Sequence, residues 1–145
     1  MRKKFEGVIL ALLLVSAPAS AAMLSLSAKE ANVRSSPGGG VLWVAYRFTP
    51  FKVLSKRGGW VKVEDFEQDS GWISGSVLEK TPSLIVKTDR ANLRKGPGGN
   101  SEVLWVLQKG YPLKKVKKQG EWYKVTDGGG TTGWLHESTV WGFTE

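Results

Sequence analysis

The sequence has no cysteine among its 145 residues. A chain without thiols forms no disulfide bond and offers no cysteine for the attachment of a lipid. Small domains outside the cytoplasm are often held together by disulfides, because their hydrophobic cores are small. Packing of apolar side chains must therefore supply the stability of this chain.

Histidine is almost as scarce, since His136 is the only one. A serine nucleophile with a histidine base would depend on that single residue, so such catalysis is not expected. Four acidic residues gather in the segment 64–69, but no glycine lies between them as a calcium-binding loop requires. Glu64 and Glu67 fall on a predicted exposed loop rather than in a cleft, which argues against glycosidase chemistry. The sequence predicts no enzyme, no metal site and no cofactor.

Helical periodicity is missing as well, because apolar residues do not recur every 3.6 positions beyond the first 22 residues. Glycine-rich turns separate short apolar segments instead, and the segment 127–130 predicts a hairpin tip between strands at 122–126 and 131–135. Residues 41–46 are apolar on both faces of an extended chain, which predicts a buried strand. These signals predict an all-β fold, a small barrel or sandwich.

The one long apolar run, residues 7–15, lies near the start of the chain. It follows a basic segment and precedes small residues, and it is shorter than the ~20 residues of a membrane-spanning helix. This is the layout of a secretory signal peptide, with cleavage predicted after the small residues 19–21. We expect residues 1–22 to be removed, and the mature protein to be periplasmic, secreted or held at the cell surface without a transmembrane segment.

The net charge is positive throughout. Removing the three basic residues and one acidic residue of the segment 1–22 changes the formal net charge from +8 to +6. Outside the cytoplasm the available polyanions are cell-wall polymers and lipids, so nucleic acid is not an expected partner. A positive charge also keeps a small protein soluble, and the charge alone does not distinguish these roles.

The remaining sequence is an internal repeat. Six of the seven tryptophans fall into three pairs, separated by 62 residues each, and the unpaired one is Trp141. A shared motif precedes these pairs at a separation of 60 residues. The matching segments are 31–39 with 91–99, 41–44 with 103–106, 59–63 with 121–125, and 71–73 with 133–135. Repetition at this spacing predicts two tandem domains, at residues 23–80 and 81–145. Each is close to the lower size limit for a domain that folds without disulfides or bound metals.

Both copies resemble the bacterial Src-homology-3 (SH3b) domain family. The resemblance rests on three motifs in order: Ala-Asn-Val-Arg-x-x-Pro-Gly, Gly-Trp-x-Lys-Val, and Gly-Trp followed by Ile or Leu. The family implies a partly open barrel of five to six strands, usually exported, often in tandem, which targets enzymes to peptidoglycan or binds proteins. Val77 and Thr139 stand where eukaryotic relatives place a groove tyrosine, so proline-rich peptide binding is not predicted.

Two tryptophans are the main candidates for ligand contact. Strand alternation places Trp60 on the face of Lys62, and Trp122 on the face of Lys124, so both rings are expected to be partly exposed. In the resembling fold this position lines the ligand groove. The alternative is a ring at the edge of the core that covers loop backbone.

The other tryptophans have more structural interpretations. Trp72 and Trp134 precede the inward-pointing Ile73 and Leu135, so their rings point outward or sideways. We expect these rings to pack against a neighbouring loop or the other copy, with groove lining as the less favoured role. The remaining pair falls in the strands expected to be buried, as core or inter-domain contacts; these are Trp43 and Trp105.

Two further groups of side chains could recognise anions. Arg34 and Arg94 could bind a carboxylate of a stem peptide, although bracing of the following loop is the favoured role. A dense basic segment could bind a polyanion, although a solvated hairpin arm that discourages edge pairing is the ordinary explanation. Its lysines are Lys114, Lys115, Lys117 and Lys118.

These observations favour an exported, non-catalytic binding module. Grooves on two SH3-like barrels are expected to recognise peptidoglycan or an envelope protein, with avidity if both engage. An accessory subunit that binds only proteins of an envelope complex is the alternative, and a cell-wall hydrolase is less favoured. The oligomeric state is not predicted.

Overall fold

The computed structural model describes residues 22–145. The predicted signal peptide, residues 1–22, lies outside this part of the chain except for Ala22. From residue 22 onward the chain forms β-strands and two single-turn 3-10 helices, and no α-helix. Among these described residues no helix is long and apolar enough to cross a membrane. The predicted all-β fold class is confirmed.

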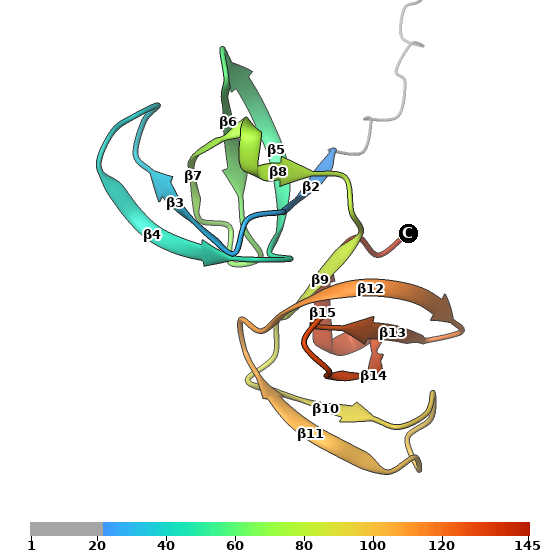
Figure 1. The fold of residues 1–145 in the computed structure, drawn as a ribbon. Helices are drawn as coiled ribbons and strands as arrows, with labels where there is room; N and C mark the ends of the chain where they lie inside the picture. Colours follow the sequence, from blue (N-terminus) through green and yellow to red (C-terminus); the bar gives the residue numbers. More distant parts are fainter. Residues whose placement is uncertain (1–21) are drawn as a thin grey trace, which may run out of the picture.

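The strands form two antiparallel sheets of seven strands with the same order (Figure 1). The first sheet has the order β4-β3-β7-β6-β5-β2-β8, and the second has the order β11-β10-β14-β13-β12-β9-β15. The first contains β2 Met23–Leu26, β3 Glu30–Arg34, β4 Val41–Tyr46, β5 Pro50–Arg57, β6 Trp60–Glu64, β7 Ser70–Ser74 and β8 Leu78–Glu79, with the 3-10 helix η2 Gly75–Val77. The second contains β9 Ser83–Val86, β10 Arg90–Arg94, β11 Val103–Gln108, β12 Pro112–Gln119, β13 Trp122–Thr126, β14 Thr132–His136 and β15 Val140–Gly142, with η3 Glu137–Thr139.

Each sheet curls around a hydrophobic core of its own. The side chains that point inward alternate along the strands with exposed ones, as in β6, where Val61 and Val63 are buried. The first core contains Leu26, Val33, Ala45, Phe51, Val61, Val63 and Ile73. The second contains Leu84, Val86, Ala91, Leu93, Leu107, Leu113, Tyr123, Val125, Leu135 and Val140. Two separate cores confirm two tandem units.

One strand prediction is wrong. Residues 41–46 were expected to be buried because both faces are apolar, but β4 and its counterpart β11 are mostly exposed. Each is the first strand of its sheet and pairs with one neighbour only, so within the described residues little covers its outer side. Ala45 and Leu107 point inward and are buried, whereas Leu42 is 53% exposed. Apolar residues on both faces here indicate an uncovered edge strand.

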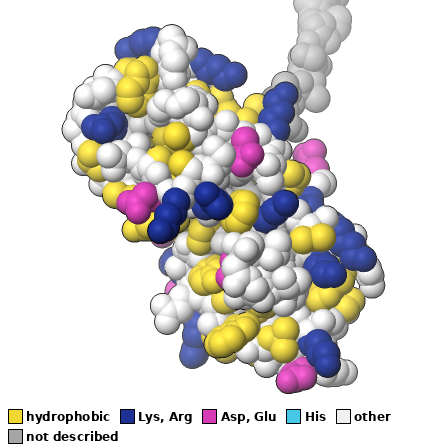
Figure 2. Space-filling view, viewed as in Figure 1, with side chains coloured by type: hydrophobic (Ala, Val, Ile, Leu, Met, Phe, Trp, Pro, Cys, Tyr) yellow, Lys and Arg dark blue, Asp and Glu magenta, His cyan; other side chains and the backbone are white. Residues whose placement is uncertain are grey.

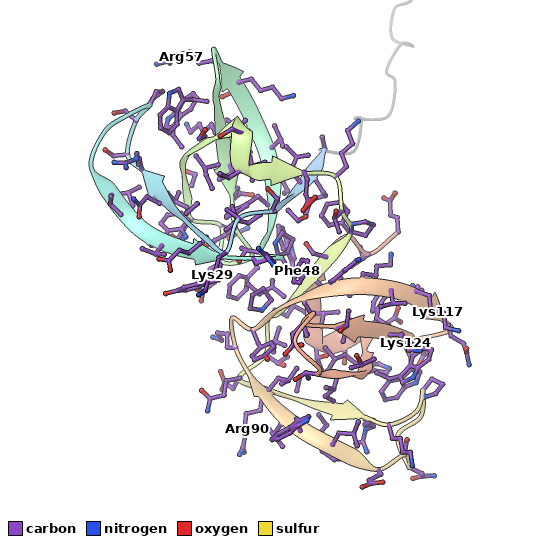
Figure 3. The ribbon with its side chains drawn as sticks, in the orientation of Figure 1. Lys29, Phe48, Arg57, Arg90, Lys117 and Lys124 are labelled. Carbon is purple, nitrogen blue, oxygen red and sulfur yellow. The ribbon has the colours of Figure 1, made fainter. Side chains whose placement is uncertain are left out.

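The two domains contact each other through turns. Phe48, in the turn between β4 and β5, has a positive φ of 71°, where the repeat places Gly110 with φ 89°. Non-glycine residues rarely adopt this conformation. The ring points toward the second domain (Figure 3), and a methyl group built on Gly128 would lie 3.6 Å from it. This inter-domain packing of the ring accounts for a phenylalanine in a turn that glycine would fill without strain.

Other contacts extend the junction. Ser25 Oγ donates a hydrogen bond of 2.7 Å to the Thr81 carbonyl, which ties β2 to the segment between the domains. A methyl group on Gly142 would lie 3.0 Å from the Pro50 ring and 2.6 Å from the Ser83 carbonyl, so the end of β15 passes close to the first domain. A hydrogen bond and close packing therefore add to the Phe48 contact at the junction between the domains.

Candidate binding grooves

The two domains carry equivalent cavities beside their 3-10 helices. In the first domain, Trp60 and Arg34 line a cavity of about 160 Å³ with Asn32 and Val77. In the second, a cavity of about 520 Å³ is lined by Arg90, Ala91, Asn92, Arg94, Val106, Trp122, His136 and Thr139. The structure thus brings together one predicted tryptophan and one predicted arginine in each domain.

The strand register explains this arrangement. Trp60 is the first residue of β6, directly after a tight turn, and it pairs with Ser74 at the end of β7. Arg34 is the last residue of β3 and pairs with Trp72 on the other side of β7. The aromatic ring and the guanidinium therefore flank the same strand end. Trp60 and its counterpart Trp122 are half-buried, in agreement with the expected partial exposure.

The arginines brace the loops that follow them. Arg34 Nη1 donates to the Gly39 carbonyl at 2.8 Å, and Arg94 Nη1 donates to the Ser101 carbonyl at 2.8 Å. Each guanidinium keeps further N–H donors beyond the one used in this bond. The arginines can therefore hold the loop and still present donors to the cavity that they line.

Trp72 and Trp134 line neither cavity. Ile73 and Leu135 point inward and are fully buried, as predicted, so the tryptophan rings lie on the outer side of the sheet. These rings are nevertheless buried, at 9% and 8% exposure. Arg57 covers the Trp72 ring at 5.0 Å and Lys117 covers the Trp134 ring at 5.6 Å, in cation–π geometry.

The third pair of tryptophans differs between the copies. Trp43 is half-buried and packs against the first core, in agreement with the expected core contact. Trp105 is 63% exposed, so the expectation of a core or inter-domain contact is wrong for this residue. It lies in the edge strand β11, beyond which the described chain supplies no covering strand.

The basic segment is tied to its own domain. Lys118 Nζ lies 3.3 Å from Glu137 Oε1, and Lys115 Nζ donates to the Phe143 carbonyl at 3.0 Å. Burial is the main cause that lowers the pKa of Lys115, and the Lys118 charge adds to it. Lys117 lies over a tryptophan ring, and Lys114 is exposed. In Figure 3 Lys117 and Lys124 lie on the outer side of the second domain, on the β12–β13 hairpin.

His136 was missed as a groove residue. It is the cross-strand partner of Trp122, and the two rings meet edge to face at 5.0 Å between centroids. Its Nε2 lies 3.1 Å from Glu121 Oε1 and its Nδ1 lies 2.7 Å from Ser138 Oγ. The hairpin predicted around residues 127–130 brought the two segments together, but the pairing of Trp122 with His136 is known from the structure.

The contacts of His136 have a structural explanation. The imidazole caps the 3-10 helix η3, because its Nδ1 accepts a hydrogen bond from the Ser138 backbone N–H. Ser74 caps η2 in the same way in the first domain, where its Oγ accepts from Ser76 N–H. A serine–histidine–glutamate chain therefore arises from the capping of η3 and from the neighbouring Glu121.

The hairpin tips of the two domains carry different charges. Asp65 Oδ1 accepts hydrogen bonds from the Glu67 and Asp69 backbone N–H groups, each at 2.9 Å. Burial is the main cause that raises the pKa of Asp65, and the charges of Asp69 and Glu67 also raise it, against the effect of these bonds. The counterpart Asp127 is also desolvated, but hydrogen bonds with Gly129 and its neighbours outweigh this and lower its pKa. The surroundings therefore shift the pKa values of these two equivalent aspartates in opposite directions.

The opposite shifts predict opposite effects on stability. An ionised Asp65 with a raised pKa weakens the folded state above its unfolded pKa, whereas Asp127 with a lowered pKa stabilises it there. We expect Asp65→Asn to raise the unfolding temperature at pH 7, and Asp127→Asn to lower it. Both differences should shrink as the pH falls below about 4, the ordinary pKa of aspartate. Thermal unfolding followed by circular dichroism at pH 3 and pH 7 measures this, and changes of equal sign would contradict it.

The architecture agrees with that of a known protein family. The fold and its cavities define two small SH3-like barrels. Residues 29–79 and residues 87–142 each match a family described as "Bacterial SH3 domain". The chain therefore belongs to the bacterial SH3 domain family and carries two such domains in tandem. The seven-stranded sheets have one or two strands more than the resemblance implied.

Similar proteins share only part of their length with this chain. A 61-residue segment is 36% identical to "Probable cell wall amidase LytH" from Staphylococcus epidermidis, and covers 41% of this chain. The match spans 21% of that relative, so the chain covers about a fifth of the curated protein. NlpC1 from Trichomonas vaginalis aligns over 91% of this chain and 50% of its own, at 15% identity and a TM-score of 0.39. An NlpC/P60 family protein from Bacillus cereus aligns over 83% and 56%, at 15% identity and a TM-score of 0.35.

Proposed function

We propose that this chain is an exported, non-catalytic binding module of the bacterial cell envelope, which recognises the peptide part of peptidoglycan. Residues 23–80 and 81–145 would be its two binding domains after removal of residues 1–22. The observation that carries the proposal is the repeated cavity that a half-buried tryptophan and an arginine line together. The relative named as a cell wall amidase supports the choice of wall material, because it shares a segment of 61 residues with this chain.

The cavity chemistry suits a peptide with a carboxylate. A tryptophan ring offers a flat apolar surface, and a guanidinium forms charge-assisted hydrogen bonds to carboxylates. The second cavity is the larger, and there His136 and Arg90 add polar groups beside Trp122. We therefore expect the second domain to contribute more of the affinity, and the first to add avidity if both engage one polymer.

A sedimentation assay with isolated sacculi tests the proposal. Truncation of an aromatic residue at the centre of a binding site commonly costs ~2 kcal/mol or more, about thirtyfold in affinity. We expect Trp122→Ala to weaken sedimentation by this amount, Trp60→Ala to weaken it less, and the double variant to abolish it. Trp105→Ala is the matched control, because this ring is exposed but lies outside both cavities.

Three outcomes would contradict the proposal. These are no sedimentation at low or high salt, an equal loss in the control variant, or release of labelled fragments that depends on His136. Cross-linking in cells would then identify an envelope protein as the partner if capture depends on Trp122. The accessory-subunit alternative predicts this last result.

A further inference from the structure

The edge strand β4 is exposed and apolar. It lies at the end of the first sheet, and within the described residues it pairs with β3 alone. Val44 is 38% exposed and Tyr46 is 56% exposed. Proteins usually protect such edges with charges, prolines or a covering element, because free edges recruit other strands. Figure 1 shows β4 along the outer border of the first domain, with its end directed toward the second.

Main-chain groups of β4 are available at this edge. Arg47 N–H donates to the Lys29 carbonyl at 3.0 Å, which makes these two residues a hydrogen-bonded pair of the ladder. Hydrogen-bonded and non-bonded pairs alternate along an antiparallel ladder. The alternation directs the N–H and carbonyl of Val44 and the N–H of Tyr46 away from β3. The Tyr46 carbonyl already accepts hydrogen bonds from Thr49.

A groove follows this edge. A cavity of about 530 Å³ is lined by the consecutive residues 42–46, by the β6–β7 hairpin tip, and by Ile85, Lys109 and Gly110 of the second domain. Successive residues of a strand point to opposite faces, so a groove lined by all of them runs along the strand's edge. The second domain closes one side, which an isolated copy would leave open.

The hairpin wall of the groove is acidic. Asp65, Glu67 and Asp69 line it, and Lys109 is the one cation among the described lining residues. Lys109 Nζ lies 3.7 Å from Asp89 Oδ1 in its own domain. Burial is the main cause that raises the pKa of Asp65, and the neighbouring carboxylates add to it. The whole chain is basic, with a formal net charge of +8. The acidic groove therefore has the opposite sign of charge to the chain as a whole.

The second domain lacks the acidic wall. Its hairpin tip has Asp127 followed by three glycines, and Gly128 is covered by the Phe48 ring. Apolar side chains are visible at the surface of both domains (Figure 2), but only the first combines an apolar edge with a carboxylate-rich hairpin. The two copies have therefore diverged at this surface.

We propose that the groove along β4 binds a cationic polypeptide segment in extended conformation, which adds as a strand to the free edge of β4. Its main chain would bond to Val44 and Tyr46, its apolar side chains would cover those of β4, and its lysine or arginine side chains would reach Asp65 and Asp69. This site is separate from the tryptophan cavities and goes beyond the function proposed for them.

A titration with two blocked peptides tests the inference. One peptide alternates valine with lysine, and the other carries glutamate in place of lysine. We expect the lysine peptide to shift the NMR amide signals of residues 42–46 and 65–69 in the purified protein, and the glutamate peptide to shift none of them. Asp65→Asn with Asp69→Asn should weaken binding about tenfold, because charge complementarity is lost.

Two further variants examine the backbone contact. Val44→Pro removes an N–H that faces away from β3, which an edge strand tolerates, and should abolish binding. Val106→Pro makes the same change in β11 and should leave binding unchanged. Trp60→Ala with Trp122→Ala should also leave it unchanged, which separates this site from the proposed wall-binding cavities.

The proposal would be overturned by binding of both peptides alike, by signals confined to the tryptophan cavities, or by affinity insensitive to the aspartate variants. Self-association that shifts the β4 signals without any peptide would also overturn it, because the occupant would then be a second copy of the chain. If β4 binds while sacculi do not, the inference stands without the proposed function.

Discussion

Gly133→Ala is expected to lower the unfolding midpoint of the second domain by on the order of 10 °C. A methyl group at this position would lie 2.8 Å from the Arg94 carbonyl oxygen and 2.8 Å from Leu93 Cγ. The carbonyl belongs to the neighbouring strand β10, so relief requires a backbone shift. Overpacking of this kind costs ~1–3 kcal/mol, and 1 kcal/mol shifts the midpoint of a domain this small by about 4–8 °C.

A second glycine of the same domain is the control. Gly99 has no heavy atom within 4 Å of a built methyl group, and its φ is not positive, so Gly99→Ala should change the midpoint little. Gly71→Ala repeats the clash in the first domain, where the methyl group would meet Val33 Cγ1 at 2.6 Å. Calorimetry measures all three variants. Equal midpoints for Gly133→Ala and Gly99→Ala would show that β10 and β14 are less closely packed than described.

Trp134→Ala is expected to cost ~3–5 kcal/mol, a large part of the stability of a small domain. The ring is 8% exposed, and Lys117 covers it at 5.6 Å. Its removal opens a hole on the outer side of the sheet and leaves the lysine stem without a support. Urea unfolding followed by circular dichroism measures the loss.

The matched variant Trp105→Ala removes the same side chain from an exposed position of the same domain. At 63% exposure the ring packs little against the protein, so the cost should stay below ~1 kcal/mol. A comparable loss in both variants would mean that the exposed ring is buried in solution by a partner or a second copy. Concentration dependence of the unfolding midpoint would separate a second copy from other partners.

Local patterns predicted much of this fold. The repeat and its turns gave the hairpin around residues 127–130, and alternation placed Ile73 and Leu135 in the cores. These properties depend on neighbouring residues within one segment. The exposure of β4 and β11 depends instead on sheet order, which places them at an edge, and sheet order is a long-range property that local hydrophobicity does not contain.

The prediction of the cavities was limited in the same way, because single residues could be proposed but their spatial arrangement could not. Trp60 and Arg34 could be proposed singly, but their position beside one cavity follows from the pairing of three strands. His136 was missed because its counterpart in the first copy is not a histidine but Ser74, which caps η2 in the same way. The junction between the domains could not be predicted, because comparison of the copies emphasises what they share, and the contact of Phe48 with Gly128 is made at two positions where the copies differ.

The turn at Phe48 gives the pair of domains a direction. Its ring needs a glycine-tipped hairpin from a following copy, and Gly110, at the same position in that copy, offers no ring to a third. The two domains therefore cannot exchange positions in the chain without loss of this contact. Reversing their order, or extending the array by inserting another second copy, should join intact barrels through a loose connection. A longer array would therefore need a middle unit that combines the phenylalanine of the first copy with the glycine hairpin tip of the second.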